Sequence, residues 1–255
     1  MKQVASIFFV IFALACNAQA PPVKAPKQLR YRVVGSYPHD SYAYTQGLQI
    51  YNGELYESIG QYGQSALRKL DPQTGAAITN RPLARKYFGE GMCVFNGLIF
   101  QLTWREQTCF IYRLDNLESL ASMSYAGEGW GLTTDGQRLI MSDGSSQIKF
   151  LSPADMSLQK TLHVRTDKGL LRNLNELELV RGELWANVYG ENFIARIDTA
   201  SGVVTGILNL PQLLPAALRD RHTDVLNGIA YDERTSHFWL TGKNWKRIFE
   251  VEIFE

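Results

Sequence analysis

The residues best suited to chemistry recur at regular spacing along this 255-residue chain. Five short tracts repeat, and their second positions hold Gln46, Glu90, Trp130, Asn175 and Asn227. A carboxylate can carry a proton, a side-chain amide can donate and accept hydrogen bonds, and an indole can enclose an apolar group. We therefore expect these five side chains to form a ring that acts as a binding or catalytic site.

The spacing of the tracts predicts the fold that positions this ring. Successive second positions are 44, 40, 45 and 52 residues apart, and repeats of ~40–50 residues built of short strands are typical of β-propellers. Each tract begins a strand that is followed by a turn and a second strand, as at Asn52-Gly53 and Asn96-Gly97. We predict an all-β, five-bladed β-propeller with the ring around its axis.

Glu90 is the candidate proton carrier. Glycines flank it at positions 89 and 91, and a carboxylate aimed into a narrow channel loses solvent. This loss raises its pKa toward the range of a general acid or base at neutral pH. A structural glutamate bonded to backbone amides fits the same pattern. Glu176 is a candidate for a second channel carboxylate, with Glu178 on the same face of its strand.

The other polar candidates are two asparagines and a lysine. Asn175 and Asn227 can bind an amide or stabilise an oxyanion, or they can merely satisfy buried backbone groups. Lys243 follows the second strand of the last repeat, where it can bind a carbonyl or a carboxylate, although a solvated charge is the common alternative. The four histidines show no metal-ligand spacing.

Aromatic residues gather near the ends of the tracts. They are Tyr44, Phe88, Trp104, Trp130 and Tyr189. Most tryptophans and tyrosines belong to cores. Because the tracts mark the mouth of the predicted channel, a small apolar pocket lined by these five side chains is the alternative.

Composition and the N-terminus limit the classes of function. A formal net charge of +1 gives no field for nucleic acid. Residues 1–20 read as a signal peptide, with an apolar run from Val4 to Ala15 and a small-residue cleavage site at Ala18-Gln19-Ala20. A lipidated Cys16 or a membrane anchor are the alternatives. We expect an exported protein, periplasmic or secreted, with an extended leader over 21–29 and the propeller over 30–255.

Three further features concern the organisation of the chain. The last repeat lacks one strand, and Tyr31–Gly35 can supply it, which would close the propeller. The segment from Leu210 to Arg221 is predicted to be a helical surface insertion. Cys93 and Cys109 form a disulfide or stay as buried free thiols.

Longer motifs resemble a known family. They are Pro38-His39-Asp40, Tyr44-Thr45-Gln46-Gly47-Leu48, Leu55-Tyr56-Glu57-Ser58, Tyr62-Gly63-Gln64-Ser65, Phe88-Gly89-Glu90-Gly91, Gly127-Glu128-Gly129-Trp130-Gly131-Leu132, Ser142-Asp143-Gly144-Ser145, Arg172-Asn173-Leu174-Asn175-Glu176-Leu177-Glu178 and Trp185-Ala186-Asn187-Val188. Together they resemble the plant-type glutaminyl cyclases, which are glutaminyl-peptide cyclotransferases and acyltransferases. The resemblance covers roughly residues 31–253.

This resemblance implies a five-bladed propeller that converts N-terminal glutamine of peptides and proteins into pyroglutamate and ammonia. Glu90 then matches the general acid/base. Gln46, Trp104, Trp130, Asn175 and Lys243 match other pocket residues, and Phe88 matches an aromatic wall. Tyr44 and Tyr189 stand where the family has Phe and Trp. The family implies no catalytic metal, while a structural calcium on the axis is compatible with it; a monomer is expected.

Two other classes of function remain open from the sequence. A metal-dependent propeller hydrolase, such as a lactonase, could hold a cation on Glu90, Asn175 and Asn227. A non-catalytic propeller could bind peptides at the channel mouth. Sensitivity to a chelator would favour the first class, and binding without ammonia release would favour the second.

Overall fold

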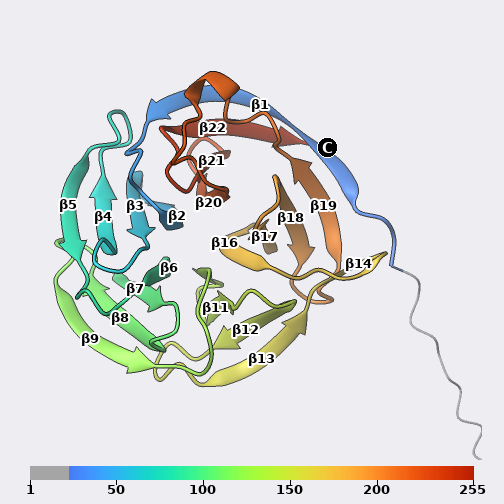
Figure 1. Cartoon of the computed structure of the whole chain (residues 1–255). Helices are drawn as coiled ribbons and strands as arrows, with labels where there is room; N and C mark the ends of the chain where they lie inside the picture. Colours follow the sequence, from blue (N-terminus) through green and yellow to red (C-terminus); the bar gives the residue numbers. More distant parts are fainter. Residues whose placement is uncertain (1–22) are drawn as a thin grey trace, which may run out of the picture.

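The computed structural model describes residues 23–255, and this part of the chain is built almost entirely of strands and turns. The strands radiate around a central axis in successive units, so the predicted all-β propeller is confirmed (Figure 1). The signal peptide and Cys16 lie outside the described residues. No helix of residues 23–255 is long and apolar enough to cross a membrane.

Each unit contributes antiparallel strands that follow one another from the axis to the rim (Figure 1). The first three units are four-stranded sheets: β2 (Thr45–Tyr51), β3 (Glu54–Ile59), β4 (Ala66–Leu70) and β5 (Ala77–Pro82); β6 (Gly89–Phe95), β7 (Leu98–Thr103), β8 (Thr108–Arg113) and β9 (Ser119–Ser124); β10 (Leu132–Thr134), β11 (Leu139–Ser142), β12 (Gln147–Leu151) and β13 (Leu158–His163). A two-stranded hairpin of β14 (Arg165–Thr166) and β15 (Gly169–Leu170) follows.

The remaining strands form one eight-stranded sheet. It contains β16 (Leu174–Val180), β17 (Glu183–Val188), β18 (Phe193–Asp198), β19 (Val204–Asn209), β20 (Leu226–Asp232), β21 (His237–Gly242), β22 (Arg247–Phe254) and β1 (Lys27–Pro38). β1 pairs antiparallel with β22, where Tyr31 opposes Ile253, as predicted. Its first three residues also pair in parallel with β19. Because β1 joins the fourth and fifth units into one sheet, the count of five separate blades stays a prediction.

Tight turns and burial explain why these segments form strands that are ordered from the axis outward. Asn52-Gly53, Asn96-Gly97 and Arg181-Gly182 all have positive φ at both residues, the geometry of the two-residue turns that match the twist of a hairpin. Burial then falls from the axis outward: every residue of β20 is buried, whereas β9 is almost entirely exposed. The inner strands therefore form the core and fix the positions of the side chains around the axis.

Two sequence predictions about organisation need correction. The segment from Leu210 to Arg221 holds only a three-residue 3-10 turn, Ala216–Leu218, because prolines at 211 and 215 remove backbone donors and disfavour helix before them. It also covers core, since Leu213 and Leu214 are buried. The leader is shorter than predicted, because β1 begins at Lys27.

Cys93 and Cys109 are both buried free thiols. Cys93 lies on β6 and Cys109 on β8, and β7 separates these strands. Burial raises the pKa of Cys93 well above its ordinary value and raises that of Cys109 to about 12. Of the two alternatives, the structure therefore supports unreactive core thiols.

Candidate functional site

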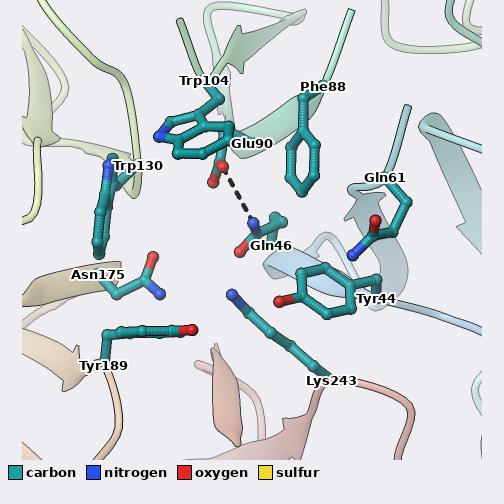
Figure 2. Close-up of a pocket in the computed structure, with 10 residues that line it drawn as sticks. All are labelled: Tyr44, Gln46, Gln61, Phe88, Glu90, Trp104, Trp130, Asn175, Tyr189 and Lys243. Carbon is teal, nitrogen blue, oxygen red and sulfur yellow. Dashed lines mark hydrogen bonds between the residues drawn. The ribbon is translucent and has the colours of Figure 1, made fainter. Parts of the chain in front are cut away.

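A cavity of about 240 Å³ opens at one end of the axis. Ten side chains line it: Tyr44, Gln46, Gln61, Phe88, Glu90, Trp104, Trp130, Asn175, Tyr189 and Lys243 (Figure 2). The nine residues selected from the sequence as catalytic or substrate-binding are all among them. The cavity is smaller than the ~300–1,000 Å³ of drug-sized sites, so it suits a group the size of one side chain.

Two recurrent positions of the repeat supply seven of the ten lining residues. Gln46, Glu90 and Asn175 lie at the starts of the inner strands β2, β6 and β16, and Trp130 lies just before β10. Trp104, Tyr189 and Lys243 directly follow the second strands β7, β17 and β21. Adjacent units place these two positions side by side at the axis, which is why residues distant in sequence share one pocket.

The glycines of the tracts are required by this close approach. A Cβ atom added at Gly91 would lie 2.5 Å from the backbone nitrogen of Leu132, and one at Gly131 would lie 2.1 Å from the carbonyl oxygen of Asn175. Any larger residue would push the inner strands apart. The glycine after Glu90 or Trp130 therefore packs one unit against the next.

Glu90 is buried, with 4% of its surface exposed. Its carboxylate accepts a hydrogen bond from Gln46 Nε2 at 3.0 Å. Burial raises the pKa of Glu90 well above 4.5; Lys243 opposes the rise, and Glu128 and Glu106 add to it. No backbone amide of the described residues donates to this carboxylate, so the purely structural alternative lacks the contacts it requires. A carboxyl group with a raised pKa is suited to proton transfer near neutral pH.

Asn227 fixes the orientation of Gln46 from behind. Asn227 Nδ2 donates to Gln46 Oε1 at 3.3 Å and to the Thr45 carbonyl oxygen at 2.9 Å. The oxygen end of the Gln46 amide thus faces Asn227, and its nitrogen faces Glu90. Asn227 does not line the cavity. The predicted ring therefore presents four of its five members to the pocket, and the fifth supports one of them.

Asn175 offers an unused acceptor. It is 2% exposed, and its Oδ1 has no hydrogen-bond partner in the part of the chain that the structure describes. An unsatisfied buried carbonyl is costly unless a ligand supplies a donor. The Asn175 side chain lies in the pocket (Figure 2), so Oδ1 is suited to bind an N–H group of a ligand.

Lys243 is buried, which rules out the alternative of a solvated charge. Only 3% of its surface is exposed, and its Nζ lies 4.6 Å from the ring centroid of Tyr44 and 5.1 Å from that of Tyr189. Burial lowers its pKa, while Glu90 and Asp224 oppose the change. Within residues 23–255, no carboxylate lies close enough to form an ion pair with it. Its ammonium group therefore remains available to an electron-rich atom in the cavity.

The aromatic side chains form two walls. Phe88 meets Trp104 and Tyr44 edge to face, with ring centroids 5.6 and 6.2 Å apart. Trp130 meets Tyr189 in the same way at 5.8 Å. Such contacts rigidify a cavity. The walls enclose Gln46, Glu90, Asn175 and Lys243 in an apolar surround, which strengthens their electrostatic interactions.

Sequence reasoning missed Gln61 as a pocket residue. In the first unit, the position equivalent to Trp104 is Gly60, where an added Cβ would lie 2.4 Å from the Phe88 ring. The next residue, Gln61, supplies the side chain instead and adopts φ of 87°. Alignment of the positions that follow the second strands could have revealed it.

Glu176 and Glu178 are not channel carboxylates of this pocket. Glu176 accepts hydrogen bonds from the backbone amides of Leu48 and Ile229 at 3.2 and 2.8 Å, and Glu178 accepts one from Tyr231 at 3.3 Å. They connect β16 to the inner strands of other units. Their role in the described structure is therefore to hold the units together.

The acidic, histidine and cysteine side chains of the described residues do not cluster. Residues 23–255 contain no group of three or more His, Cys, Asp and Glu side chains that could hold a metal ion, whereas calcium takes six to eight oxygen ligands that usually include carboxylates. Both carboxylate oxygens of Glu176 already accept backbone amides. The structural calcium therefore stays a prediction.

Fold and pocket together define a β-propeller with a small pocket that holds a buried carboxyl group, and comparison with known proteins identifies its family. The chain belongs to the glutamine cyclotransferase family, whose sequence model matches residues 6–253.

Two relatives agree with this assignment. A glutaminyl-peptide cyclotransferase of Arabidopsis thaliana is 38% identical over 226 residues, covering 87% of this chain and 70% of that protein. The crystal structure of Myxococcus xanthus glutaminyl cyclase superimposes with a TM-score of 0.83 at 30% identity, covering 89% of this chain and 98% of that one.

Proposed function

We propose that this protein converts the N-terminal glutamine of peptides and proteins into pyroglutamate with release of ammonia. Its family membership supports this reaction. The observation that carries the proposal is the buried carboxyl of Glu90, which faces a cavity that also holds an unpaired lysine and the unused oxygen of Asn175. Cyclisation of glutamine needs a proton carrier, a stabiliser of negative charge and an acceptor for an amine.

The proposed reaction is an intramolecular displacement. The α-amine nitrogen attacks the side-chain amide carbon, a carbon–nitrogen bond forms, and the carbon–nitrogen bond to the amide NH₂ breaks. Glu90 takes one proton from the amine and returns it to the departing nitrogen, which leaves as ammonia. The raised pKa of Glu90 lowers the cost of holding this proton at neutral pH.

Charge develops on the amide oxygen during the attack. Lys243 can stabilise this oxyanion, and a well-placed donor in such a site contributes ~3–4 kcal/mol. Asn175 Oδ1 can accept an N–H of the substrate. Gln46 holds Glu90 at 3.0 Å and, with Asn175, is positioned to orient the substrate amide. These roles are our proposals for residues of one pocket.

The aromatic walls give the reaction its geometry. Cyclisation requires the glutamine side chain to fold back on its own amine, and holding that conformer removes entropy from the barrier. Trp104, Trp130 and Phe88 enclose the space beside Glu90 (Figure 2). Tyr44 and Tyr189 add hydroxyl groups where the family has Phe and Trp, and they flank Lys243.

The first experiment follows ammonia release and peptide mass with purified protein and several peptides that begin with glutamine, with and without a chelator. We expect loss of one ammonia per peptide at the same rate in both conditions. Loss of activity with the chelator would favour the metal-dependent hydrolase. Binding of the peptides without any mass change would favour the binding propeller and contradict our proposal.

We also infer that the protein is exported to the periplasm or secreted. The apolar run from Val4 to Ala15 and the cleavage site that ends at Ala20 support this inference. Expression of the full chain, followed by fractionation and mass measurement of the N-terminus, tests it. A mature chain that starts at Pro21 is expected; a lipid-modified Cys16 would replace soluble export with anchoring, and an intact Met1 in the cytoplasm would contradict export.

A further inference from the structure

One carboxylate behind the pocket contacts both of its tryptophans. Glu128 lies between β9 and β10 and does not line the cavity. Its Oε2 accepts hydrogen bonds from Trp104 Nε1 at 2.8 Å and from Trp130 Nε1 at 3.1 Å. Trp104 belongs to the second unit and Trp130 directly precedes the third. A single oxygen therefore fixes the relative position of two walls that come from different units.

The second oxygen of Glu128 is also occupied. Arg105 Nε donates to Oε1 at 3.1 Å, and the Arg105 guanidinium carbon lies 3.7 Å from the centroid of the Trp104 ring. Burial alone would raise the pKa of Glu128, but hydrogen bonds from Trp130, Trp104 and Arg105 outweigh it and lower the pKa. Glu128 thus carries a negative charge at neutral pH, and its indole partners bind an ionised acceptor.

The backbone around Glu128 is fixed. Gly129 N donates to the Trp104 carbonyl oxygen at 3.0 Å, and the Tyr125 hydroxyl donates to the carbonyl of Thr103. A Cβ at Gly129 would lie 2.3 Å from that hydroxyl, so the segment packs too closely for any larger residue. The carboxylate is therefore supported by two attachments to the end of β7.

We propose that Glu128 is a positioning residue for the cyclisation, because it sets the spacing and tilt of Trp104 and Trp130 and places a fixed negative charge near Glu90. This inference rests on the proposed function. The charged groups that act on Glu90 are Lys243, Glu128 and Glu106. Removing the charge of Glu128 should lower the pKa of Glu90, whereas a purely structural role for Glu128 would leave that pKa unchanged.

The position of the indoles can be tested without any activity assay. The chain has five tryptophans, so the ¹⁵N-labelled protein should give five indole N–H signals. We expect Glu128→Ala to shift two of them, which Trp104→Phe and Trp130→Phe assign. Glu118→Ala is the matched control, since Glu118 also pairs with an arginine but is exposed and does not line the cavity. Unshifted Trp104 and Trp130 signals in Glu128→Ala would overturn the proposal.

Kinetics of ammonia release provide the second test. We expect kcat/KM of Glu128→Ala to fall by about 10- to 100-fold, mainly through kcat, since small misplacements of substrate carry losses of this order. Glu128→Gln keeps one acceptor oxygen and should retain more activity. In both variants the pKa of Glu90 should fall, so the low-pH limb of the pH profile of kcat/KM should move to lower pH. Glu118→Ala should match the wild type.

Two outcomes would contradict the inference: wild-type kcat/KM in Glu128→Ala, or an unmoved low-pH limb in both Glu128 variants. If Glu128→Ala fails to fold, Glu128→Gln supplies both the indole signals and the pH profile. Absence of ammonia release by the wild type would contradict the proposed function instead, and the indole signals would still decide whether Glu128 positions the two walls.

Discussion

One buried glutamate, Glu178, should make the stability of this protein fall as the pH rises. Glu178 lies on β16 and accepts a hydrogen bond from the Tyr231 backbone amide. Burial raises its pKa from 4.5 to about 8, because the charged form loses water that one backbone amide and the Thr133 hydroxyl replace only in part. The folded protein therefore keeps this group protonated at neutral pH.

The sign and size of the effect follow from this shift. Below pH 4.5 the carboxyl is protonated in both states, so its contribution to stability is fully present. As the pH rises from 4.5 to about 8, the unfolded chain ionises and the folded chain does not, so stability is lost. At ~1.36 kcal/mol per pKa unit, the loss reaches about 4 kcal/mol near pH 8.

Glu178→Gln should abolish this loss because glutamine keeps the shape and does not ionise. Its oxygen can still accept from Tyr231, and its NH₂ can donate to the Thr133 hydroxyl. We expect nearly equal stability of variant and wild type at pH 5, and a gain for the variant of about 4 kcal/mol at pH 8, on the order of 10 °C in Tm. Urea unfolding at both pH values measures it, with exposed Glu118→Gln as the control. Parallel pH profiles for Glu178→Gln and wild type would refute the reasoning.

Three further predictions concern single side chains. Glu57→Gln should destabilise the protein by about 3 kcal/mol at pH 7, and by less at pH 3, as measured by urea unfolding. Burial would raise the pKa of Glu57, but Arg68 and His39 outweigh burial and bring the pKa to about 2. The ionised carboxylate therefore stabilises the folded protein above pH 4.5, and this stabilisation is lost as the pH falls toward 2. Gln46→Leu should lower kcat/KM by about 10- to 100-fold, because a hydrogen bond to a charged group contributes ~1.5–3 kcal/mol, and equal rates would remove Gln46 from its role. Lys243→Met should lower kcat by about 100- to 1,000-fold, the usual loss for an oxyanion donor. It should also move the low-pH limb of the kcat/KM profile to higher pH, because Lys243 lowers the pKa of Glu90. An unmoved limb would contradict the electrostatic interaction between Lys243 and Glu90.

The repeat made the fold and the pocket predictable from the sequence. Because each tract begins an inner strand, the periodicity alone brings Gln46, Glu90, Trp130 and Asn175 to one axis, and the turn sequences fix where each second strand begins. Tyr44, Phe88, Trp104, Tyr189 and Lys243 were candidates from their places near the ends of the tracts and strands, the resemblance pointed to the same residues, and all of them line the same cavity. Their catalytic and binding roles stay predictions.

Contacts between units could not be predicted in this way. Asn227 lies behind Gln46, and Glu176 bonds to β2 and β20, because these partners depend on how far neighbouring inner strands approach. Glu128 accepts hydrogen bonds from two indoles, and it lies in the connection between β9 and β10, outside the repeated tracts. Periodicity predicts which residues lie around the axis. How deeply each one is buried and which hydrogen bonds it forms depend on side chains from other units.

The central claim is that Glu90 carries the proton in the cyclisation of N-terminal glutamine. The most direct measurement compares ammonia release from one Gln-initiated peptide by the wild type and by Glu90→Gln, with thermal unfolding as the check on folding. We predict a folded variant whose kcat is at least ~100-fold lower, the scale of a lost general acid/base. Near-normal turnover by Glu90→Gln would contradict the account.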